Sequence, residues 1–215
     1  MNKISISILS ALLISLGGCD WQGIRGNRVI TTEQRPIGAF ANLEADGAFE
    51  IEWTSGAPAL SITTDQNLLQ YIRSEVNGDK LRLHSTERLR PTHGIKVIVS
   101  SPTLNGAQFR GAVRFSALQL SGANFFLESQ GASRVTLTGK VGELTAGMTG
   151  ASKLMAESLQ TGRTELSLTG ASKAEVNVTD TLKVSITGAG KVVYSGNPRS
   201  VVRDVTGAGT IRPRE

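Results

Sequence analysis

Apolar and polar residues alternate along the second half of the chain in a pattern that recurs roughly every 19 residues. Each copy contains a Gly-Ala-Ser or Gly-Ala-Gly tripeptide, and apolar side chains follow its glycine at fixed offsets, as in Val135 and Leu137 or Leu154 and Ala156. A period of two is typical of strands with one buried face, not of helices. Each copy therefore predicts two short strands, separated by the tripeptide at one corner and by polar residues such as 138–142 at the other.

A repeat of this length excludes a crossover helix, because a βαβ unit needs roughly 30 residues. Successive copies must instead stack strand upon strand in parallel, about 4.8 Å apart, with equivalent residues in columns. The predicted fold class is all-β: a right-handed parallel β-helix, or β-solenoid, with rungs of roughly 19 residues.

The tripeptide glycines and their earlier copies form one predicted column of turn residues. Its members are Gly47, Gly111, Gly131, Gly150, Gly170, Gly188 and Gly207. A glycine is required at such a corner either for a positive φ or for close approach of the neighbouring rung. Either reason predicts that Gly150→Val is costly.

The first half of the chain carries the same pattern less regularly. Ile51 and Trp53 follow Gly47 at the offsets seen in later copies. Further strands are predicted at Ala59–Thr63, Lys80–His84, Ile95–Val99 and Ala107–Phe109.

One segment of the first half, near residues 65–77, predicts a short helix. Asp65 can cap its start, Leu68, Leu69 and Ile72 share one face, and Asn77-Gly78 is a stop signal. We expect this helix to cover the open end or the flank of the solenoid.

The N-terminus indicates export. Lys3 precedes an apolar stretch, Ile4–Leu16, that is too short to span a bilayer, which predicts a signal peptide over residues 1–18. Leu16-Gly17-Gly18-Cys19 resembles a bacterial lipobox, which implies lipidation of Cys19 and a linker over residues 19–36. Several acyl chains anchor a protein stably to a membrane. Cys19 is the only cysteine, so no intramolecular disulfide is expected.

The membrane that carries the anchor depends on Asp20. A residue of this type after the lipidated cysteine resembles the inner-membrane retention signal of enteric bacteria, and otherwise the outer membrane is expected. Either way the sequence predicts a periplasm-facing lipoprotein of the bacterial cell envelope.

Several motifs in the same order resemble the head GIN domain family. They are the lipobox, the Gly47–Trp53 segment, the 65–78 segment and the repeats that begin at Thr149, Thr169, Thr187 and Thr206. This family, described as auto-transporter adhesin heads, is often found on bacterial lipoproteins and has no catalytic motif. The resemblance implies one solenoid domain over residues 37–215 with an adhesin-like binding role.

The repeat places cations at one offset, three residues after the glycine. The predicted cationic column contains Arg114, Arg134, Lys153, Lys173 and Lys191. Two interpretations stay open: a solvated corner that discourages aggregation, or a salt-dependent site for lipopolysaccharide phosphates or acidic glycans. The formal net charge of +5 is mild and does not indicate nucleic acid.

Beside the cations, Ser133, Ser152 and Ser172 form a second predicted column. We expect these hydroxyls to support the turn, not to act in catalysis.

The repeats show no arrangement typical of a β-helix enzyme. Glu143 and Glu165 occupy different phases, and His84 and His93 are the only histidines. We expect no enzyme activity, no metal and no cofactor. A purely structural envelope scaffold and a carbohydrate-active enzyme remain the alternatives to a binding module.

The last rung carries two irregular residues. Arg203 falls in an inward-facing phase and Pro213 stops strand pairing, which predicts a second copy of the chain as a cap for the C-terminal edge.

Overall fold

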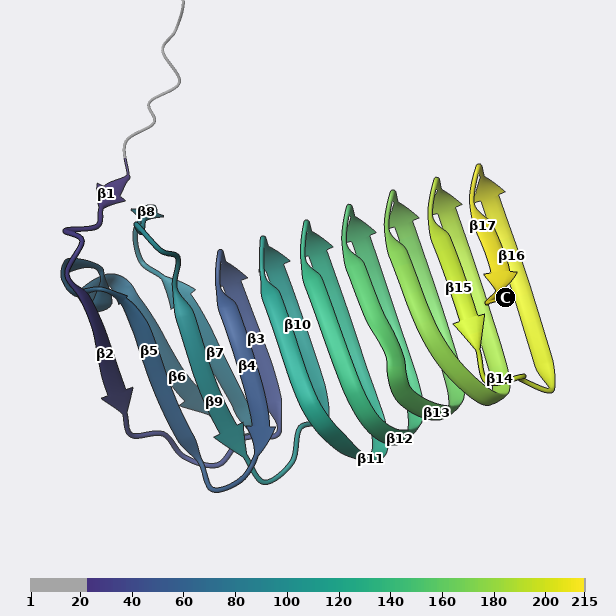
Figure 1. The fold of residues 1–215 in the computed structure, drawn as a ribbon, viewed down its shortest axis with the longest axis horizontal. Coiled ribbons are helices and arrows are strands. Elements are labelled where there is room, and N and C mark those ends of the chain that lie inside the picture. Colours follow the sequence, from purple (N-terminus) through teal and green to yellow (C-terminus); the bar gives the residue numbers. More distant parts are fainter. Residues whose placement is uncertain (1–22, 215) are drawn as a thin grey trace, which may run out of the picture.

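The computed structural model describes residues 23–214, which form a β-solenoid of stacked strands (Figure 1). The predictions for the signal peptide, Cys19 and Asp20 lie outside these residues.

The regular part of the solenoid begins at residue 106. Its strands are β10 (Gly106–Gly111), β11 (Arg114–Gly131), β12 (Arg134–Gly150), β13 (Lys153–Gly170), β14 (Lys173–Gly188), β15 (Lys191–Ser195), β16 (Ser200–Gly207) and β17 (Thr210–Pro213). All of them pair in parallel, and Gly131, Gly150 and Gly170 stand opposite one another in successive rungs. The predicted parallel stacking of the repeats is confirmed.

The second corner of each rung differs from the prediction. We expected polar residues to separate two short strands there, but β11 to β14 each continue around it as one strand. The pairing shifts in register between Thr136 and Gly139 of β12, because a bulge lets the strand bend while most of its hydrogen bonds persist.

This bend divides the solenoid into two walls. The front wall contains β9, β4, β15, β17 and residues 114–118, 134–137, 153–156 and 173–178 of the long strands. The back wall contains β7, β3, β10, β16 and residues 124–131, 143–150, 163–170 and 181–188.

The N-terminal rungs do not stack in chain order. Their strands are β3 (Asn42–Gly47), β4 (Glu50–Ser55), β7 (Lys80–Ser85) and β9 (Lys96–Ser101). The rung of β3 and β4 lies between the β7–β9 rung and the regular repeats, because β3 pairs both β7 and β10. Gly47 stands opposite Gly111, so the predicted phase of this early copy is confirmed.

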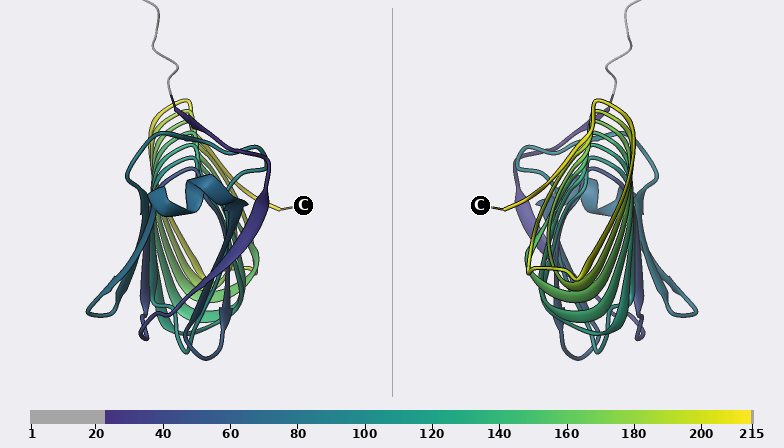
Figure 2. Two further views of the ribbon diagram at one scale, coloured as in Figure 1. Left: turned by 90° about the vertical axis from the view of Figure 1, so that its left-hand side faces the viewer. Right: turned by 90° about the vertical axis from the view of Figure 1, so that its right-hand side faces the viewer.

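Antiparallel strands close the N-terminal end. β2 (Ile30–Arg35) pairs β5 (Ala59–Asp65), which pairs β9, while β6 (Ile72–Asn77) forms a hairpin with β7. Between β5 and β6 the 3₁₀ helix η1 (Gln66–Tyr71) crosses the opening of the solenoid, as the left view of Figure 2 shows. A helix at the open end was predicted, and its position is confirmed.

The predicted length of this helix was wrong. Residues Ile72–Asn77 alternate between buried or half-buried and exposed positions, and they pair the free edge of β7 as a strand. Asn77 instead ends β6, and Gly78-Asp79 is a two-residue hairpin turn, in which glycine at the first position has a φ of +62°. Asp65 makes no side-chain capping bond to η1.

Part of the predicted linker over residues 19–36 is folded. β1 (Ile24–Arg25) pairs with β8 (Leu89–Arg90), and β2 belongs to the main sheet. Residues 23–35 therefore belong to the closed N-terminal end of the solenoid.

The core is one continuous cluster inside the two walls. It includes the inward-facing Val135, Leu154, Ala174 and Val192, each 1% exposed or less, so the predicted inward phase is confirmed. Tyr194 in the last rungs is only half-buried.

Candidate functional site

The predicted column of turn glycines, from Gly47 to Gly207, lies at the corner where the back-wall strand of each rung ends and the chain turns into the front wall. We call this the glycine corner. The glycines of this column have φ values between +100° and +131°. From Gly111 onward, a Cβ at each position would lie 2.5–2.7 Å from the carbonyl oxygen of the preceding glycine. Both predicted reasons for glycine therefore apply, and the corner tolerates no side chain there.

The serine column supports this corner. Ser133, Ser152 and Ser172 are buried, and their hydroxyls donate to the glycine carbonyls of Gly111, Gly131 and Gly150 at 3.2–3.4 Å. These hydroxyls are engaged inside the corner and do not face solvent. The expected support of the turn by these hydroxyls is confirmed.

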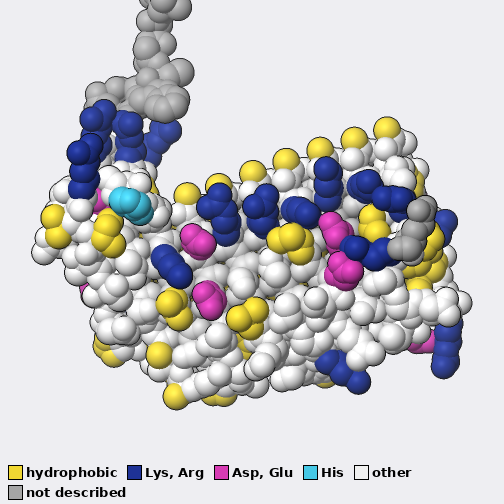
Figure 3. All heavy atoms as spheres, in the orientation of Figure 1, with side chains coloured by type: hydrophobic (Ala, Val, Ile, Leu, Met, Phe, Trp, Pro, Cys, Tyr) yellow, Lys and Arg dark blue, Asp and Glu magenta, His cyan; other side chains and the backbone are white. Residues whose placement is uncertain are grey.

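The five cations of the predicted column stand directly opposite one another on the front wall. Arg114 pairs in register with Arg134, which precedes Lys153, Lys173 and Lys191 in successive rungs. Figure 3 shows basic side chains in a row across this face. Neighbouring like charges about 5 Å apart in water repel by roughly 0.8 kcal/mol, so the column gains from a bound anion.

Acidic and neutral residues bound the column at its two ends. Glu50 stands opposite Arg114 on the N-terminal side, and Thr210 stands opposite Lys191 on the last rung. The uninterrupted run of cations therefore belongs to the regular repeats, and beyond Glu50 the next residue of the column, Lys96 of β9, is again basic.

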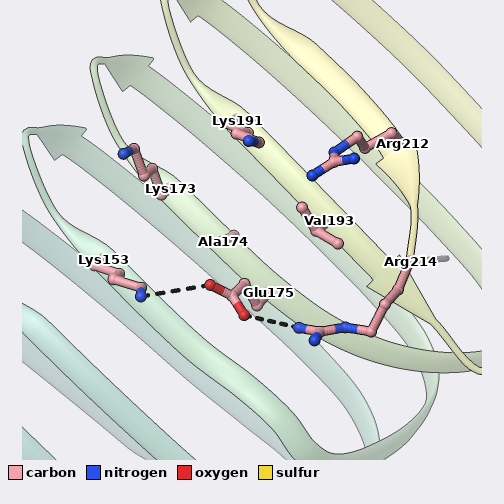
Figure 4. A pocket seen from close by; sticks show the side chains of 8 residues that line it. All are labelled: Lys153, Lys173, Ala174, Glu175, Lys191, Val193, Arg212 and Arg214. Carbon is pink, nitrogen blue, oxygen red and sulfur yellow. Dashed lines mark hydrogen bonds and ion pairs between the residues drawn. The ribbon is translucent and has the colours of Figure 1, made fainter.

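The C-terminal half of the column borders a shallow hollow of about 460 Å³ (Figure 4). Its lining residues are Lys153, Lys173, Ala174, Glu175, Lys191, Val193, Arg212 and Arg214. Five of these side chains are cationic and one is acidic, so the hollow favours anions.

Glu175 neutralises only part of this charge. Its carboxylate contacts the Lys153 ammonium at 3.4 Å and the Arg214 guanidinium at 2.8 Å. Arg214 also reaches Glu157 at 2.8 Å. Within residues 23–214, Lys173, Lys191 and Arg212 form no ion pair, and these three groups remain available to a ligand.

Arg212 and Arg214 were missed by the sequence interpretation. Arg212 lies two residues after Thr210 on β17 and is exposed, as Thr210 is. The equivalent residues of the earlier rungs are Val193 and Glu175. Because that column is not basic elsewhere, the repeat pattern gave no signal for it.

A second hollow adjoins the first along the wall. It has a volume of about 370 Å³ and is lined by Arg114, Arg134 and Lys153 together with alanines and Ser133 of the turns. Lys153 borders both hollows, so the two adjoin along the cationic column. Two adjoining hollows suit an extended polyanion better than a compact one.

Glu143 and Glu165, the two acids compared in the sequence, each face a cation of a neighbouring strand. Glu143 stands opposite Arg163, and Glu165 accepts from the Lys183 ammonium at 2.8 Å. In the part of the chain that the structure describes, no three His, Cys, Asp or Glu side chains come together in a group that could hold a metal ion. Over the same residues, no helix has the length and apolar character needed to cross a bilayer.

Comparison with known proteins places the fold. The family model described as "Putative auto-transporter adhesin, head GIN domain" matches residues 39–198, which confirms the resemblance drawn from the motifs. Comparison with curated proteins found no match.

Solved structures share this architecture at low sequence identity. A "putative adhesin" from Bacteroides fragilis has a TM-score of 0.75 and 22% identity, covering 89% of this chain and 100% of that one. A "putative lipid binding protein" from Parabacteroides distasonis has a TM-score of 0.56 and 20% identity, covering 90% and 100%. A "putative adhesin" from Parabacteroides merdae has a TM-score of 0.55 and 20% identity, covering 89% and 99%.

Proposed function

Because this chain belongs to the head GIN domain family, we propose that it is a non-catalytic binding module of the cell envelope. Its ligands are polyanions, either acidic glycans or the phosphates of lipopolysaccharide, and its binding surface is the cationic column of the front wall with Arg212. The observation that carries the proposal is the set of three unpaired cations, Lys173, Lys191 and Arg212, on one hollow.

The geometry favours a repeating ligand. Strands of one sheet lie about 4.8 Å apart, so charges in the column recur at that spacing. A chain that carries several anionic groups can contact several rungs at once, and weak contacts then add along its length. Each contact is exposed and screened by salt, so binding falls as ionic strength rises.

The test replaces Lys173, Lys191 and Arg212 together by glutamine and measures retention on immobilised heparin and on lipopolysaccharide. We expect the dissociation constant to rise roughly tenfold or more, because three exposed charge contacts of about 0.5–1 kcal/mol each are lost. The wild type should elute at a higher salt concentration than the variant.

A matched control carries the same change of charge elsewhere. Lys140, Lys183 and Arg163 lie in the same repeats but outside the front wall, and their replacement by glutamine should leave retention unchanged. Equal loss in both variants would show that total charge alone acts. No retention of the wild type at low salt would reject the polyanion site and favour a structural scaffold.

We also propose that the mature protein is anchored through lipidated Cys19 and faces the periplasm. The lipobox resemblance and the cell-envelope character of the family support this proposal. Labelling with a radioactive fatty acid should mark the wild type and not Cys19→Ser. Membrane fractionation then decides between the inner membrane, as Asp20 implies, and the outer membrane.

A further inference from the structure

A second basic surface lies at the sealed end of the solenoid, away from the front-wall column. We define the basic patch as Arg25, Arg28 and Arg88. β1 and β8 pair in parallel, which brings Arg25 opposite Arg90, and the amide of Ile24 donates to the carbonyl of Arg88 at 2.9 Å. Figure 3 shows Lys and Arg side chains gathered at this end.

Asp65 holds the two basic segments together. Its buried carboxylate accepts from the amide of Arg28 at 2.7 Å and from the amide and hydroxyl of Thr92 at 2.8 and 2.9 Å. Arg28 has a φ of +66°, which is unfavourable for a residue with a side chain. The strained turn persists because these bonds fix it, and its side chain is held in the exposed patch.

The charge of the patch is open to solvent. Arg25, Arg28 and Arg88 are exposed, and none of their guanidinium groups forms an ion pair within residues 23–214. Glu87 is the acid of the same loop, whereas the carboxylate of Asp65 is enclosed. Exposed charge at this end is therefore dominated by arginine.

Apolar side chains border the patch. Val29 and Ile30, which follow Arg28 directly, are 52% and 43% exposed. Arginine beside exposed aliphatic residues matches the interface of a bilayer, where anionic headgroups lie above acyl chains.

The closeness of Cys19 to the basic patch makes a membrane the expected partner of the patch. Cys19 precedes Gly23 by four residues, a chain that spans at most about 14 Å when extended. Electrostatic attraction to a membrane acts over a Debye length of about 8 Å at physiological salt. A lipid-anchored chain therefore holds the patch close to the bilayer.

We propose that the basic patch docks on anionic phospholipid headgroups of the membrane that carries the lipid anchor. This inference rests on the proposed anchoring through Cys19. Docking directs the sealed end toward the bilayer and leaves the front wall and the C-terminal end facing the periplasm. The anchor and the patch together then fix an orientation that acyl chains alone leave free.

The test uses the mature chain, residues 19–215, with Cys19→Ser, so that acyl chains do not mask the contribution of the patch. The strands and the core cluster of the described residues 23–214 lie within this chain. It should co-sediment with vesicles of phosphatidylcholine and phosphatidylglycerol but not with phosphatidylcholine alone. Arg25→Gln, Arg28→Gln and Arg88→Gln together should weaken partitioning on the order of a hundredfold, because each basic residue near an anionic surface contributes roughly fivefold.

The control is a second triple variant, Arg134→Gln, Lys153→Gln and Lys173→Gln, on the front wall. It should retain vesicle binding and lose heparin retention, which separates this inference from the proposed polyanion site. Vesicle binding that survives in the patch variant, or that is lost in the front-wall variant, would overturn the docking surface. Unfolding curves matching those of the wild type confirm that each variant is folded, and fatty-acid labelling tests the anchor independently.

Discussion

At the N-terminal end, η1 crosses the opening of the solenoid and buries Leu68 and Leu69, whereas at the C-terminal end Val205 of the last rung remains 41% exposed (Figure 2). The carbonyls of Leu69 and Ile72 accept from the Arg35 guanidinium at 2.9 and 2.7 Å, which ties β2 to the helix. No equivalent lid follows β17 within the described chain.

The difference shows what a stack of repeats supplies and what it lacks. Each rung covers its neighbour, so a repeat sequence can add rungs but cannot finish an end. The N-terminal end is closed by residues that depart from the repeat: antiparallel strands, a short helix and a buried carboxylate. The regular region instead supplies columns of similar side chains, on which the proposed polyanion binding rests.

The largest effect is expected in the regular region, at the glycine corner. Gly150→Val forces a β-branched residue to φ +105° and places its Cβ 2.5 Å from the carbonyl oxygen of Gly131. We expect the free energy of unfolding to fall by about 4 kcal/mol or more, from backbone strain and overpacking together. Denaturant unfolding followed by circular dichroism measures the change.

Gly147→Val is the matched control, because Gly147 lies on the same strand. A Cβ there meets nothing within 4 Å, and its φ is not positive. Valine should be neutral or stabilising by up to about 1 kcal/mol, since it reduces the freedom of the unfolded chain and suits a strand. Similar losses in both variants would mean that the corner has no special requirement.

The next effect falls on the sealed end. Burial alone would raise the pKa of Asp65, but the hydrogen bonds from Thr92 and Arg28 outweigh it and hold the pKa below its usual value. Asp65→Asn removes the carboxylate and leaves buried donors without a full set of acceptors. We expect a loss of about 2 kcal/mol at neutral pH.

This loss should depend on pH in a defined direction. A lowered native pKa stabilises the fold above the unfolded value of about 3.9, and that contribution disappears as the pH falls through the native pKa. The gap in melting temperature between wild type and Asp65→Asn should therefore narrow below about pH 4. Asp46→Asn makes the same change at an exposed position and serves as control, with little expected effect on stability. A gap of constant size down to pH 2 would contradict the role of the ionised carboxylate.

The two regions also differ in how much of their structure could be predicted from the sequence. Val135, Leu154 and the glycine column were predictable, because a period of two and a fixed repeat length specify both phase and register. The cationic column followed from the same offset. Strand phase, turn glycine and cation are all specified within one repeat, and the same residues recur in the following repeats.

The sealed end could not be predicted in the same way. Asp65 is a plausible helix cap by sequence, but its partners Arg28 and Thr92 are 37 and 27 residues away. Residues Ile72–Asn77 form a strand only because β7 offers a free edge. Such choices are made by tertiary pairing, which overrides local propensity.

The smallest effect concerns the open end, where a second copy of the chain was expected. Arg203 stands opposite the inward-facing Val184 and extends to donate to the Tyr194 hydroxyl at 3.0 Å. Two copies that meet through β16 would bring this charge into a shared interior, and an inward charge on an edge strand opposes such pairing. Val202, at 51% exposure, adds apolar surface to the same edge.

Arg203→Val should therefore strengthen self-association while changing the stability of the monomer by less than about 1 kcal/mol. Sedimentation velocity over a range of concentrations should show a monomer–dimer equilibrium shifted toward the dimer by roughly tenfold, the effect of about 1.4 kcal/mol. Arg199→Val changes the same residue type outside the strands and should not shift the equilibrium. If Arg203→Val instead dissociates a dimer formed by the wild type, the arginine is part of the interface and the C-terminal end is sealed by assembly, as the N-terminal end is sealed by its own chain.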